Sequence, residues 1–328
     1  MVIPLRGTPM RVLFCGTPEI GIPTLRALLS DARFRVAGVI TQPDRPRGRR
    51  LEPGESAIKK LARGAALDVF QPEKIRSPEA QQWIEAKSPD AVVLIAYGQI
   101  LPSRLLSIPR LGCINLHASL LPKYRGAAPI AWAIANGETR TGITTMQIDA
   151  GMDTGPLLLR KEMEIGPDEA APELAARMAI AGAPLVVESL EGLDRGTLRP
   201  EAQETAQASY APLLKREDGR IRWELAAQQI YNRMRGLAPW PGTFAEFRGS
   251  RVHLWGRPAG RESASLEATA PGSVREMDDA VLAACGAGTW LEITEAQPEG
   301  RRRMSAAEFA RGARLARPGG QAPGERFQ

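Results

Sequence analysis

The sequence RVLFCGTPEIGIPTLRALL, residues 11–29, begins with an apolar run and passes through a glycine-containing turn into apolar residues at helical spacing. The run up to Cys15 is typical of a buried strand. Ile22, Leu25 and Leu29 then recur on one face of a helix. This stretch therefore predicts the strand, turn and helix from which α/β folds are built.

The same alternation continues along more than half of the chain. Strands are predicted at 34–41, 68–70, 91–96, 113–117, 141–148 and 157–164, and helices at 55–66, 78–86, 128–135 and from Pro172 to about Leu190. The strand from Ala91 to Ala96 is almost wholly apolar, as expected where both faces of a mainly parallel sheet are covered. We therefore predict a doubly wound, Rossmann-like α/β domain over residues 1–193.

The sequence changes character beyond this domain. Residues 194–211 are polar, contain Gly and Pro and have no sustained periodicity, which predicts a linker. A helix at 223–237 and several short strands separated by turns then predict a smaller, OB-like β-barrel domain at 212–317. Residues 318–328 are rich in Gly and Pro and are predicted to form a disordered tail.

Composition narrows the class of protein. No apolar run approaches the roughly 20 residues of a membrane-spanning helix, and the first ten residues lack the pattern of a signal peptide. We therefore expect a cytoplasmic protein with no membrane partner. The three cysteines are widely spaced, so neither a disulfide nor a metal site is expected. A net charge of +6 favours a polyanionic partner, although the total alone is a weak signal.

Several common cofactor motifs are absent from the sequence. Gly16-Thr17-Pro18 has proline where a dinucleotide-binding G-x-G-x-x-G motif needs its second glycine. The sequence also has no Walker lysine loop, no His-Glu-x-x-His motif and no closely paired cysteines. These absences argue against a nicotinamide dehydrogenase, a phosphate-cradling enzyme and a zinc enzyme.

Three polar residues are candidates for catalysis. Asn115 and His117 lie two apart at a predicted strand end, so their side chains point to the same side. Asp153 lies in the turn 149–155, where neighbouring glycines allow close approach. From residue types and spacing alone, His117 is still more often a structural, hydrogen-bonded histidine than a catalyst.

An Asn, His and Asp set suits acyl transfer to an amine. The attacking nitrogen must lose a proton, the carbonyl oxygen becomes anionic, and the leaving nitrogen must gain a proton. Asn115 can donate to the oxyanion, His117 can exchange protons near neutral pH, and Asp153 can orient the imidazole or stabilise its charged form.

Residues 115–130, NLHASLLPKYRGAAPI, closely resemble the signature of the folate-dependent formyltransferases, and MDTG at 152–155 resembles their second motif. The similarity continues through 13–18, 96–102 and 238–242, and it is greatest to the members that act on methionyl-tRNA. It implies Asn115, His117 and Asp153 as the catalytic set. Glycine is frequent in the family where this chain has Ala118, a change between small residues that touches no catalytic group.

The resemblance also implies a formyl donor, 10-formyltetrahydrofolate, acting as co-substrate without a metal. The folate-contacting stretch that it implies comprises Ser119, Leu120, Leu121 and Pro122. Ile95, Tyr97 and Gly98, at the end of an apolar strand, are a plausible further wall for the pteridine ring, although a plain core strand explains their apolar character almost equally well.

A basic stretch, DRPRGRR at 44–50, follows the second predicted strand. Arginine binds phosphates bidentately, and the resemblance implies that this region lies against the tRNA, so Arg45, Arg47, Arg49 and Arg50 are predicted to bind the acceptor stem of an initiator methionyl-tRNA. Without the resemblance, a solvated disordered loop is the simpler interpretation. Further basic residues lie at Lys215, Arg216, Arg220, Arg222, Arg233, Arg235, Arg248, Arg251, Arg257 and Arg301–Arg303.

The predicted function is therefore formyl transfer to the methionine amine of initiator tRNA, in support of translation initiation, by a monomer. One alternative is a formyltransferase of the same fold that acts on a small amine, such as glycinamide ribonucleotide or an amino sugar. The other is a non-catalytic RNA-binding relative. The basic stretch and second domain argue against the first, and the intact catalytic set argues against the second.

Overall fold

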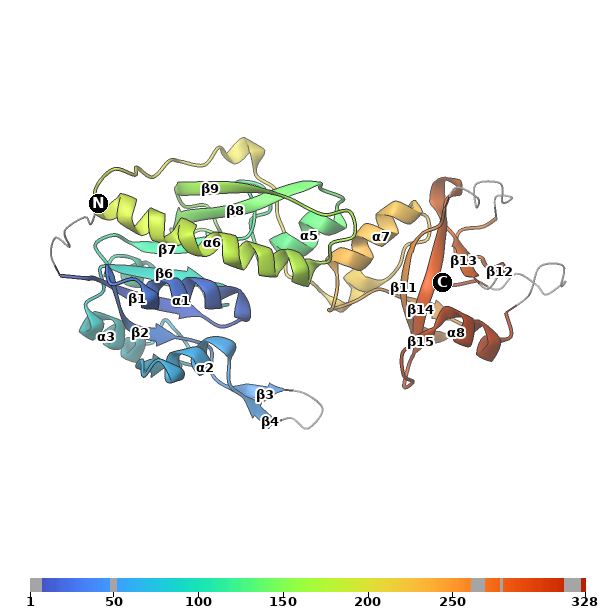
Figure 1. The fold of residues 1–328 in the computed structure, drawn as a ribbon, viewed down its shortest axis with the longest axis horizontal. Coiled ribbons are helices and arrows are strands. Elements are labelled where there is room, and N and C mark those ends of the chain that lie inside the picture. Colours follow the sequence, from blue (N-terminus) through green and yellow to red (C-terminus); the bar gives the residue numbers. More distant parts are fainter. Residues whose placement is uncertain (1–7, 48–51, 261–268, 278–279, 316–325) are drawn as a thin grey trace. The chain divides into compact units, whose positions relative to one another are not determined.

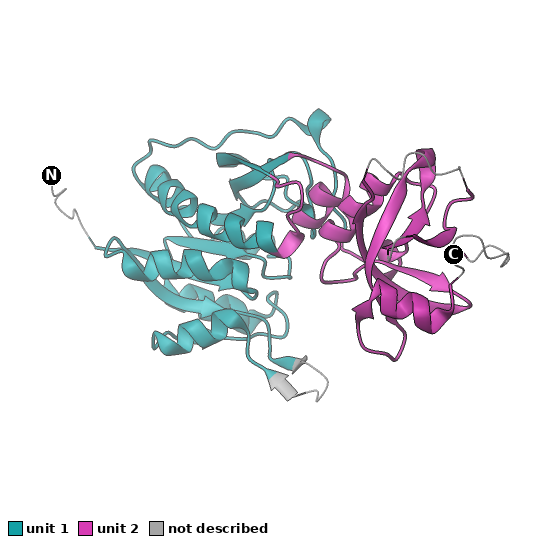
Figure 2. Cartoon of the chain, turned by 45° about the vertical axis from the view of Figure 1, so that its right-hand side comes forward, with its two compact units in different colours: residues 1–129, 140–164, 173–212 teal, residues 130–139, 165–172, 213–328 magenta. Residues whose placement is uncertain are grey.

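The computed structural model describes residues 8–47, 52–260, 269–277, 280–315 and 326–328. The chain divides into two units, which have different colours in Figure 2. The first contains Met1–Pro129, Arg140–Glu164 and Glu173–Pro212, and the second contains Ile130–Thr139, Ile165–Pro172 and Leu213–Gln328. This division differs from the predicted one, because two short segments before residue 193 group with the second unit.

A seven-stranded sheet in the order β5-β2-β1-β6-β7-β8-β9 forms the centre of the first unit (Figure 1). Its strands are β1 (Met10–Gly16), β2 (Phe34–Ile40), β5 (Val69–Phe70), β6 (Ala91–Ile95), β7 (Cys113–His117), β8 (Arg140–Gln147) and β9 (Leu157–Glu164). Neighbours from β5 to β7 pair in parallel, whereas β8 and β9 are antiparallel additions. The predicted doubly wound domain is confirmed, with apolar β6 in the interior of the sheet.

The helices of the first unit are α1 (Ile22–Ser30), α2 (Ala57–Gly64), α3 (Pro78–Lys87), α4 (Ser103–Leu106) and most of α6 (Ala171–Asp194), with 3-10 turns at Glu19–Gly21 and Thr205–Gln207. Helix α5 (Pro129–Ala135) belongs mostly to the second unit. Ser56 and Ser77 cap α2 and α3 by accepting hydrogen bonds from the first turn of each helix. Figure 1 shows α1 and α6 along the same face of the sheet. A Cβ on Gly182 of α6 would lie 2.4 Å from the Leu116 side chain, so α6 fixes the back of β7.

The segment predicted as a linker, 194–211, is packed on the first unit. Leu157 and Glu201 donate backbone hydrogen bonds to each other at 2.7 and 2.9 Å, and the N–H of Arg125 donates to Ser209 O at 2.8 Å. Residues 201–211, which we call the strap, therefore run beside β9 and the loop after β7. Composition alone does not indicate these backbone contacts.

An antiparallel sheet in the order β10-β11-β14-β13-β12 forms the second unit, and β15 pairs with β14. The strands are β10 (Phe244–Phe247), β11 (Ser250–Pro258), β12 (Val274–Met277), β13 (Ala280–Ala284), β14 (Trp290–Pro298) and β15 (Met304–Ser305). The helices are α7 (Ala227–Gly236) and α8 (Ala306–Ala313), with 3-10 turns at Arg216–Gly219 and Gly286–Gly288. The prediction of a smaller β domain after the α/β domain is confirmed.

Helix α7 begins four residues later than the predicted start at 223. Trp223 is only 3% exposed and packs in the core of the second unit, while the N–H of Leu225 donates to Arg222 O in a turn. The Gln229 side chain then accepts from the N–H of Ala226 at 3.1 Å, which satisfies a free donor at the start of the helix. The tertiary packing of the tryptophan therefore overrides the helical periodicity.

The predicted disordered tail is wrong at its last three residues. Phe327 is fully buried, stacks on Trp223 with ring centroids 5.6 Å apart, and pairs with Phe247 in an antiparallel bridge. Burial of an aromatic ring supplies enough apolar area to order a short segment. Residues 318–325 of the predicted tail lie outside the described residues.

The basic stretch after β2 contains a short hairpin. Strands β3 (Arg45–Arg47) and β4 (Glu52–Gly54) pair antiparallel, and Figure 1 shows the hairpin projecting from the end of the sheet. No strand had been predicted in this stretch. Arg49 and Arg50 lie outside the described residues.

Over the described ranges, no helix is both long and apolar enough to cross a membrane. In the same ranges, no group of three His, Cys, Asp or Glu side chains is arranged to hold a metal ion. Cys15, Cys113 and Cys285 are free and buried, and burial raises the pKa of Cys113 and of Cys285 to about 12.

Candidate active site

The candidate site begins at the carboxyl end of β7. Asn115 pairs in register with Leu94 of parallel β6, and His117 pairs with Thr144 of antiparallel β8. β7 is therefore the strand at which the sheet changes from parallel to antiparallel. Asn115 is 8% exposed and His117 is 6% exposed, so both polar side chains are held at the edge of the core.

Two acceptors flank the imidazole of His117. Nε2 lies 2.9 Å from the backbone carbonyl oxygen of Tyr124, and Nδ1 lies 3.7 Å from Oδ2 of Asp153. A carbonyl oxygen can only accept, so Nε2 carries a proton and donates to it. The other ring nitrogen, Nδ1, faces the carboxylate of Asp153. At 3.7 Å that carboxylate acts on the ring through charge rather than through a direct hydrogen bond.

The two acids of the turn 149–155 have different roles. Asp149 accepts from the N–H of Gly151 and from the Thr154 hydroxyl, so it closes the turn on itself. Asp153 has a positive φ of 52° and directs its carboxylate to the loop after β7, where the N–H of Gly126 donates to Oδ2 at 2.8 Å. Sequence reasoning chose Asp153 of the two, and the structure brings that residue to His117.

The predicted folate-contacting stretch forms the start of the same loop. Ser119 is fully buried and donates to Lys123 O at 2.6 Å, while its own carbonyl accepts from the Thr144 hydroxyl at 2.7 Å. Leu121 and Pro122 are buried, and Leu120 is half-buried. The stretch lies beside His117, but these side chains mainly fix the loop.

The second predicted folate wall follows β6. Ile95 and Tyr97 are each 1% exposed, and the Tyr97 ring packs with Leu13 and Cys15 in the core. Burial raises the pKa of the Tyr97 hydroxyl, which has no hydrogen-bond partner within the described residues. The backbone is fixed instead by Gln42, whose Nε2 donates to Tyr97 O at 2.9 Å, and Gly98 adopts a φ of 86°. The exposed residues here are Ala96 and Gly98.

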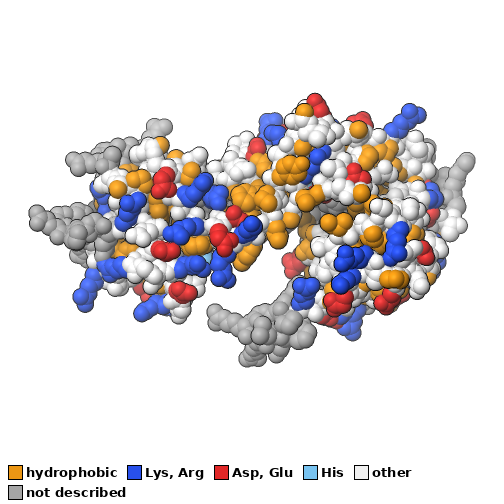
Figure 3. Space-filling view, turned by 180° about the vertical axis from the view of Figure 1, so that it is seen from behind, with side chains coloured by type: hydrophobic (Ala, Val, Ile, Leu, Met, Phe, Trp, Pro, Cys, Tyr) orange, Lys and Arg blue, Asp and Glu red, His pale blue; other side chains and the backbone are white. Residues whose placement is uncertain are grey.

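The predicted tRNA-binding arginines are only partly described. Arg45 is exposed and Arg47 lies on the same strand, β3. In the second unit, Arg235 is 8% exposed and donates to the carbonyls of Gly166 and Glu169, which makes it a structural residue. Arg257 pairs with Glu292. Figure 3 shows basic side chains interspersed with acidic ones on the visible face, so the positive charge there is locally balanced.

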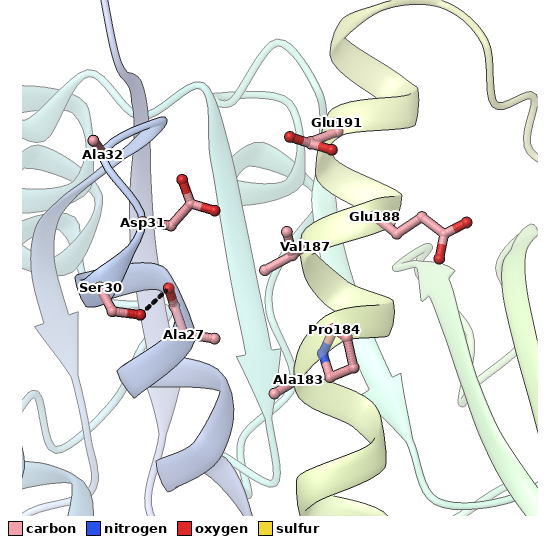
Figure 4. Close-up of a pocket in the computed structure, with 9 residues that line it drawn as sticks. All are labelled: Ala27, Ser30, Asp31, Ala32, Ala183, Pro184, Val187, Glu188 and Glu191. Atoms are coloured by element: carbon pink, nitrogen blue, oxygen red, sulfur yellow. Dashed lines mark hydrogen bonds between the residues drawn. The ribbon is translucent and has the colours of Figure 1, made fainter. Parts of the chain in front are cut away.

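A pocket of about 550 Å³ lies between the end of α1 and α6. Figure 4 shows that Asp31, Glu188 and Glu191 line it together with small apolar residues. It contains none of the predicted site residues. An acidic lining disfavours a phosphate or a carboxylate ligand, so this pocket is not the candidate site.

Sequence reasoning missed the two backbone groups that hold the catalytic set together. They are the Tyr124 carbonyl and the Gly126 N–H, and both belong to the YRG segment of the quoted signature. Tyr124 has a φ of 60° and Gly126 a φ of 122°, an arrangement that bends the loop back on β7. The glycine was the available signal, because a positive φ favours that residue.

Comparison with known proteins agrees with this site. The Formyl transferase family matches residues 10–190, and the Formyl transferase, C-terminal domain family matches residues 213–314. The methionyl-tRNA formyltransferase of Solibacter usitatus is 51% identical over 306 residues, covering 93% of this chain and 96% of that protein. That of Acidobacterium capsulatum is 50% identical over 308 residues, covering 94% and 98%.

Solved structures show the same fold at much lower identity. HypX from Aquifex aeolicus, in complex with tetrahydrofolic acid, has a TM-score of 0.62 at 16% identity and covers 98% of this chain and 51% of that one. WlaRD, a sugar 3N-formyl transferase in the presence of dTDP and 5-N-formyl-THF, has a TM-score of 0.63 at 17% identity and covers 90% and 100%. With both families matched over most of its length and relatives at half identity, this chain belongs to the formyl transferase family.

Proposed function

We propose that this chain transfers the formyl group of 10-formyltetrahydrofolate to the α-amino group of methionine esterified to an initiator tRNA. The observation that carries the proposal is His117, held between a carbonyl and a carboxylate beside Asn115, in a chain half identical to proteins named for this reaction. Asn115 and His117 lie within residues 115–130, the stretch that resembles the family signature, and Asp153 lies in the second motif.

The proposed chemistry is addition and elimination at the formyl carbon. The neutral amine forms a C–N bond and generates an oxyanion, which the Asn115 amide and the protonated His117 ring stabilise. The C–N10 bond then breaks, and tetrahydrofolate leaves with a proton on N10. The attacking nitrogen loses one proton, so His117 Nδ1 needs only to pass a proton between the two nitrogens. Asp153 aligns the ring and attracts its positive charge.

The donor is proposed to bind at the carboxyl ends of β1 and β6. In a doubly wound sheet, ligands bind outside the strand ends where the strand order reverses, and the order of this sheet reverses between β1 and β6. The residues that follow β6 present their backbone there, with Gly98 leaving room for close approach. Ile95, Tyr97 and Gly98 would form one wall, and the loop from Ser119 to Pro122 the other.

The initiator tRNA is proposed to contact the basic stretch that contains Arg45, Arg47, Arg49 and Arg50. A short hairpin with two arginines on one strand can place guanidinium groups along a phosphate backbone. Replacement of all four by alanine should raise KM for the charged tRNA. In a plot of log binding constant against log salt concentration, the slope should become less steep by roughly 0.7–0.9 for each lost phosphate contact. The four Arg→Lys replacements are the matched control, since they keep the charge.

The proposal is tested by formyl transfer from 10-formyltetrahydrofolate to methionyl-initiator tRNA, with free methionine, glycinamide ribonucleotide and an amino sugar as parallel acceptors. Transfer to the charged tRNA alone is the expected result. Transfer only to a small amine would keep the catalytic site and overturn the acceptor, and no transfer would leave an RNA-binding role.

The same proposal places the chain in the cytoplasm, where initiator tRNA is charged and used, and treats it as a monomer. A single species of one-chain mass in sedimentation equilibrium is the expected result for the oligomeric state.

A further inference from the structure

One side chain of the strap connects both halves of the catalytic centre. Gln203 Nε2 donates to the backbone carbonyl of Asp153 at 2.8 Å and to that of Gly155 at 2.7 Å. Its Oε1 accepts from Arg125, at 3.1 Å from Nε and 2.7 Å from Nη2. One amide therefore links the turn that carries Asp153 to the loop that partners His117.

Arg125 is buried, and its backbone is held by the strap. It is 2% exposed, and its backbone N–H donates to Ser209 O while its carbonyl accepts from the N–H of Ala211 at 2.7 Å. The Ser209 hydroxyl also accepts from the N–H of Tyr124 at 2.9 Å. The strap thus holds the loop by backbone contacts, and Gln203 transmits that hold to the turn.

The turn needs such a hold because its geometry is unfavourable without support. Asp153 adopts a φ of 52°, a left-handed backbone conformation that a non-glycine residue keeps only where the surroundings determine it. At Gly155, a Cβ would lie 1.9 Å from Gln147 O, so the end of the turn is already pressed against β8. Gln203 donates to the backbone carbonyls of both residues.

We propose that Gln203 is a positioning residue that sets the distance between Asp153 and His117 by clamping the turn to the Arg125 loop. This rests on the role proposed above for Asp153. The clamp uses both ends of the amide: the NH2 group satisfies two carbonyls, and the oxygen satisfies a buried guanidinium. The role is one of placement, because the side chain acts through the turn and the loop.

The chemistry of the amide suggests two variants. Gln203→Glu keeps an acceptor for Arg125 but places a carboxylate oxygen against two carbonyl oxygens, which removes the donor and adds repulsion. Gln203→Met keeps the length and volume and removes both functions. Gln207→Met is the matched control, because Gln207 is an exposed glutamine of the same strap whose amide donates to nearby Glu204.

The test measures kcat and KM for both substrates in these variants and in Asp153→Asn, with the folded fraction determined by circular dichroism. We expect kcat to fall about tenfold to a hundredfold for both Gln203 variants, as for a misplacement of about 1 Å. KM for the charged tRNA should stay within about twofold, and Gln207→Met should match the parent. The chain has two histidines, so the ring signals of His117 can be followed by NMR with His253 as an internal reference.

Displacement of Asp153 should move the His117 signals in the Gln203 variants and leave those of His253 in place. Parent-like kcat in Gln203→Glu, together with a loss in Asp153→Asn, would overturn the clamp alone. Full activity in Asp153→Asn would instead remove the role of Asp153 on which the clamp depends. A kcat loss that disappears on correction for the folded fraction would reduce Gln203 to an ordinary structural residue and also overturn the proposal.

Discussion

The two histidines of the chain lie in contrasting surroundings. His117, at the end of β7, is flanked by a backbone carbonyl and a carboxylate. His253, in the middle of β11, lies between the rings of Phe244 and Trp255, at centroid distances of 5.7 and 6.4 Å. Burial, followed by the charge of Arg251, lowers the pKa of His253. Residue type alone therefore does not identify a catalyst, because of the two histidines only His117 lies beside a backbone carbonyl and a carboxylate.

The largest expected effect is on kcat, and it should differ between variants of the two histidines. His117→Ala should lower kcat by about a hundredfold to ten-thousandfold, because it removes the group that exchanges protons and stabilises the oxyanion. His253→Ala is the control and should leave kcat close to that of the parent. Steady-state formyl transfer to methionyl-initiator tRNA measures both, and equal losses in the two variants would contradict the assignment of His117.

The next prediction concerns Asn115, which lies beside His117 at the end of β7. Asn115→Ala removes the proposed amide donor to the oxyanion and should lower kcat by about a hundredfold to a thousandfold. Asn115→Asp has nearly the same size but presents an acceptor, so it should be no better than alanine. If Asn115→Asp keeps parent activity in the same assay, an amide donor at this position is not needed.

Gly126 tests whether the backbone partners matter as much as the side chains. A Cβ on this residue would lie 2.6 Å from Ala211 O, at a φ of 122° that side chains rarely adopt. Gly126→Ala should therefore displace the N–H that donates to Asp153 and lower kcat by about tenfold to a hundredfold. Gly196→Ala is the control, since Gly196 also has a positive φ but has open space around it.

The smallest expected effect concerns the stability of the second unit. Because burial lowers the pKa of His253, the unfolded chain takes up a proton on this residue before the folded one does. Stability should therefore fall as the pH drops below about 6.5, the ordinary histidine value. His253→Phe should reduce this dependence slightly. Urea denaturation followed by tryptophan fluorescence at pH 7.5 and 5.5 measures the difference, and an unchanged slope would remove His253 as its cause.

The order of elements in the first unit could be predicted because local signals agree with the tertiary structure. Apolar β6 and the helices that start after Ser56 and Ser77 are examples. Helix α8 was missed although Ser305 stands three residues before Glu308, because the segment is short and follows a run of arginines. The start of α7 was misplaced because the burial of Trp223 depends on residues far along the chain.

In the candidate site, too, some groups could be predicted from the sequence and others could not. Asn115, His117 and Asp153 could be chosen from the sequence because their side chains have recognisable chemistry. The Tyr124 carbonyl and the Gly126 N–H could not, since every residue has such groups and only folding decides which are close. The contacts of Gln203 span 78 residues to Arg125 and 50 to Asp153, a separation that no local pattern reports.

The burial of Phe327 has a consequence for synthesis on the ribosome. Phe327 completes a cluster with Trp223, Phe247 and Phe309, so the core of the second unit includes residues more than a hundred positions apart. The strands of the first unit all lie between Met10 and Glu164. The first unit can therefore fold during translation before the second, whose core is completed only when Phe327 has left the exit tunnel. Protease resistance of chains held on the ribosome by C-terminal extensions, either too short or long enough to bring Phe327 out of the tunnel, would reveal the delay.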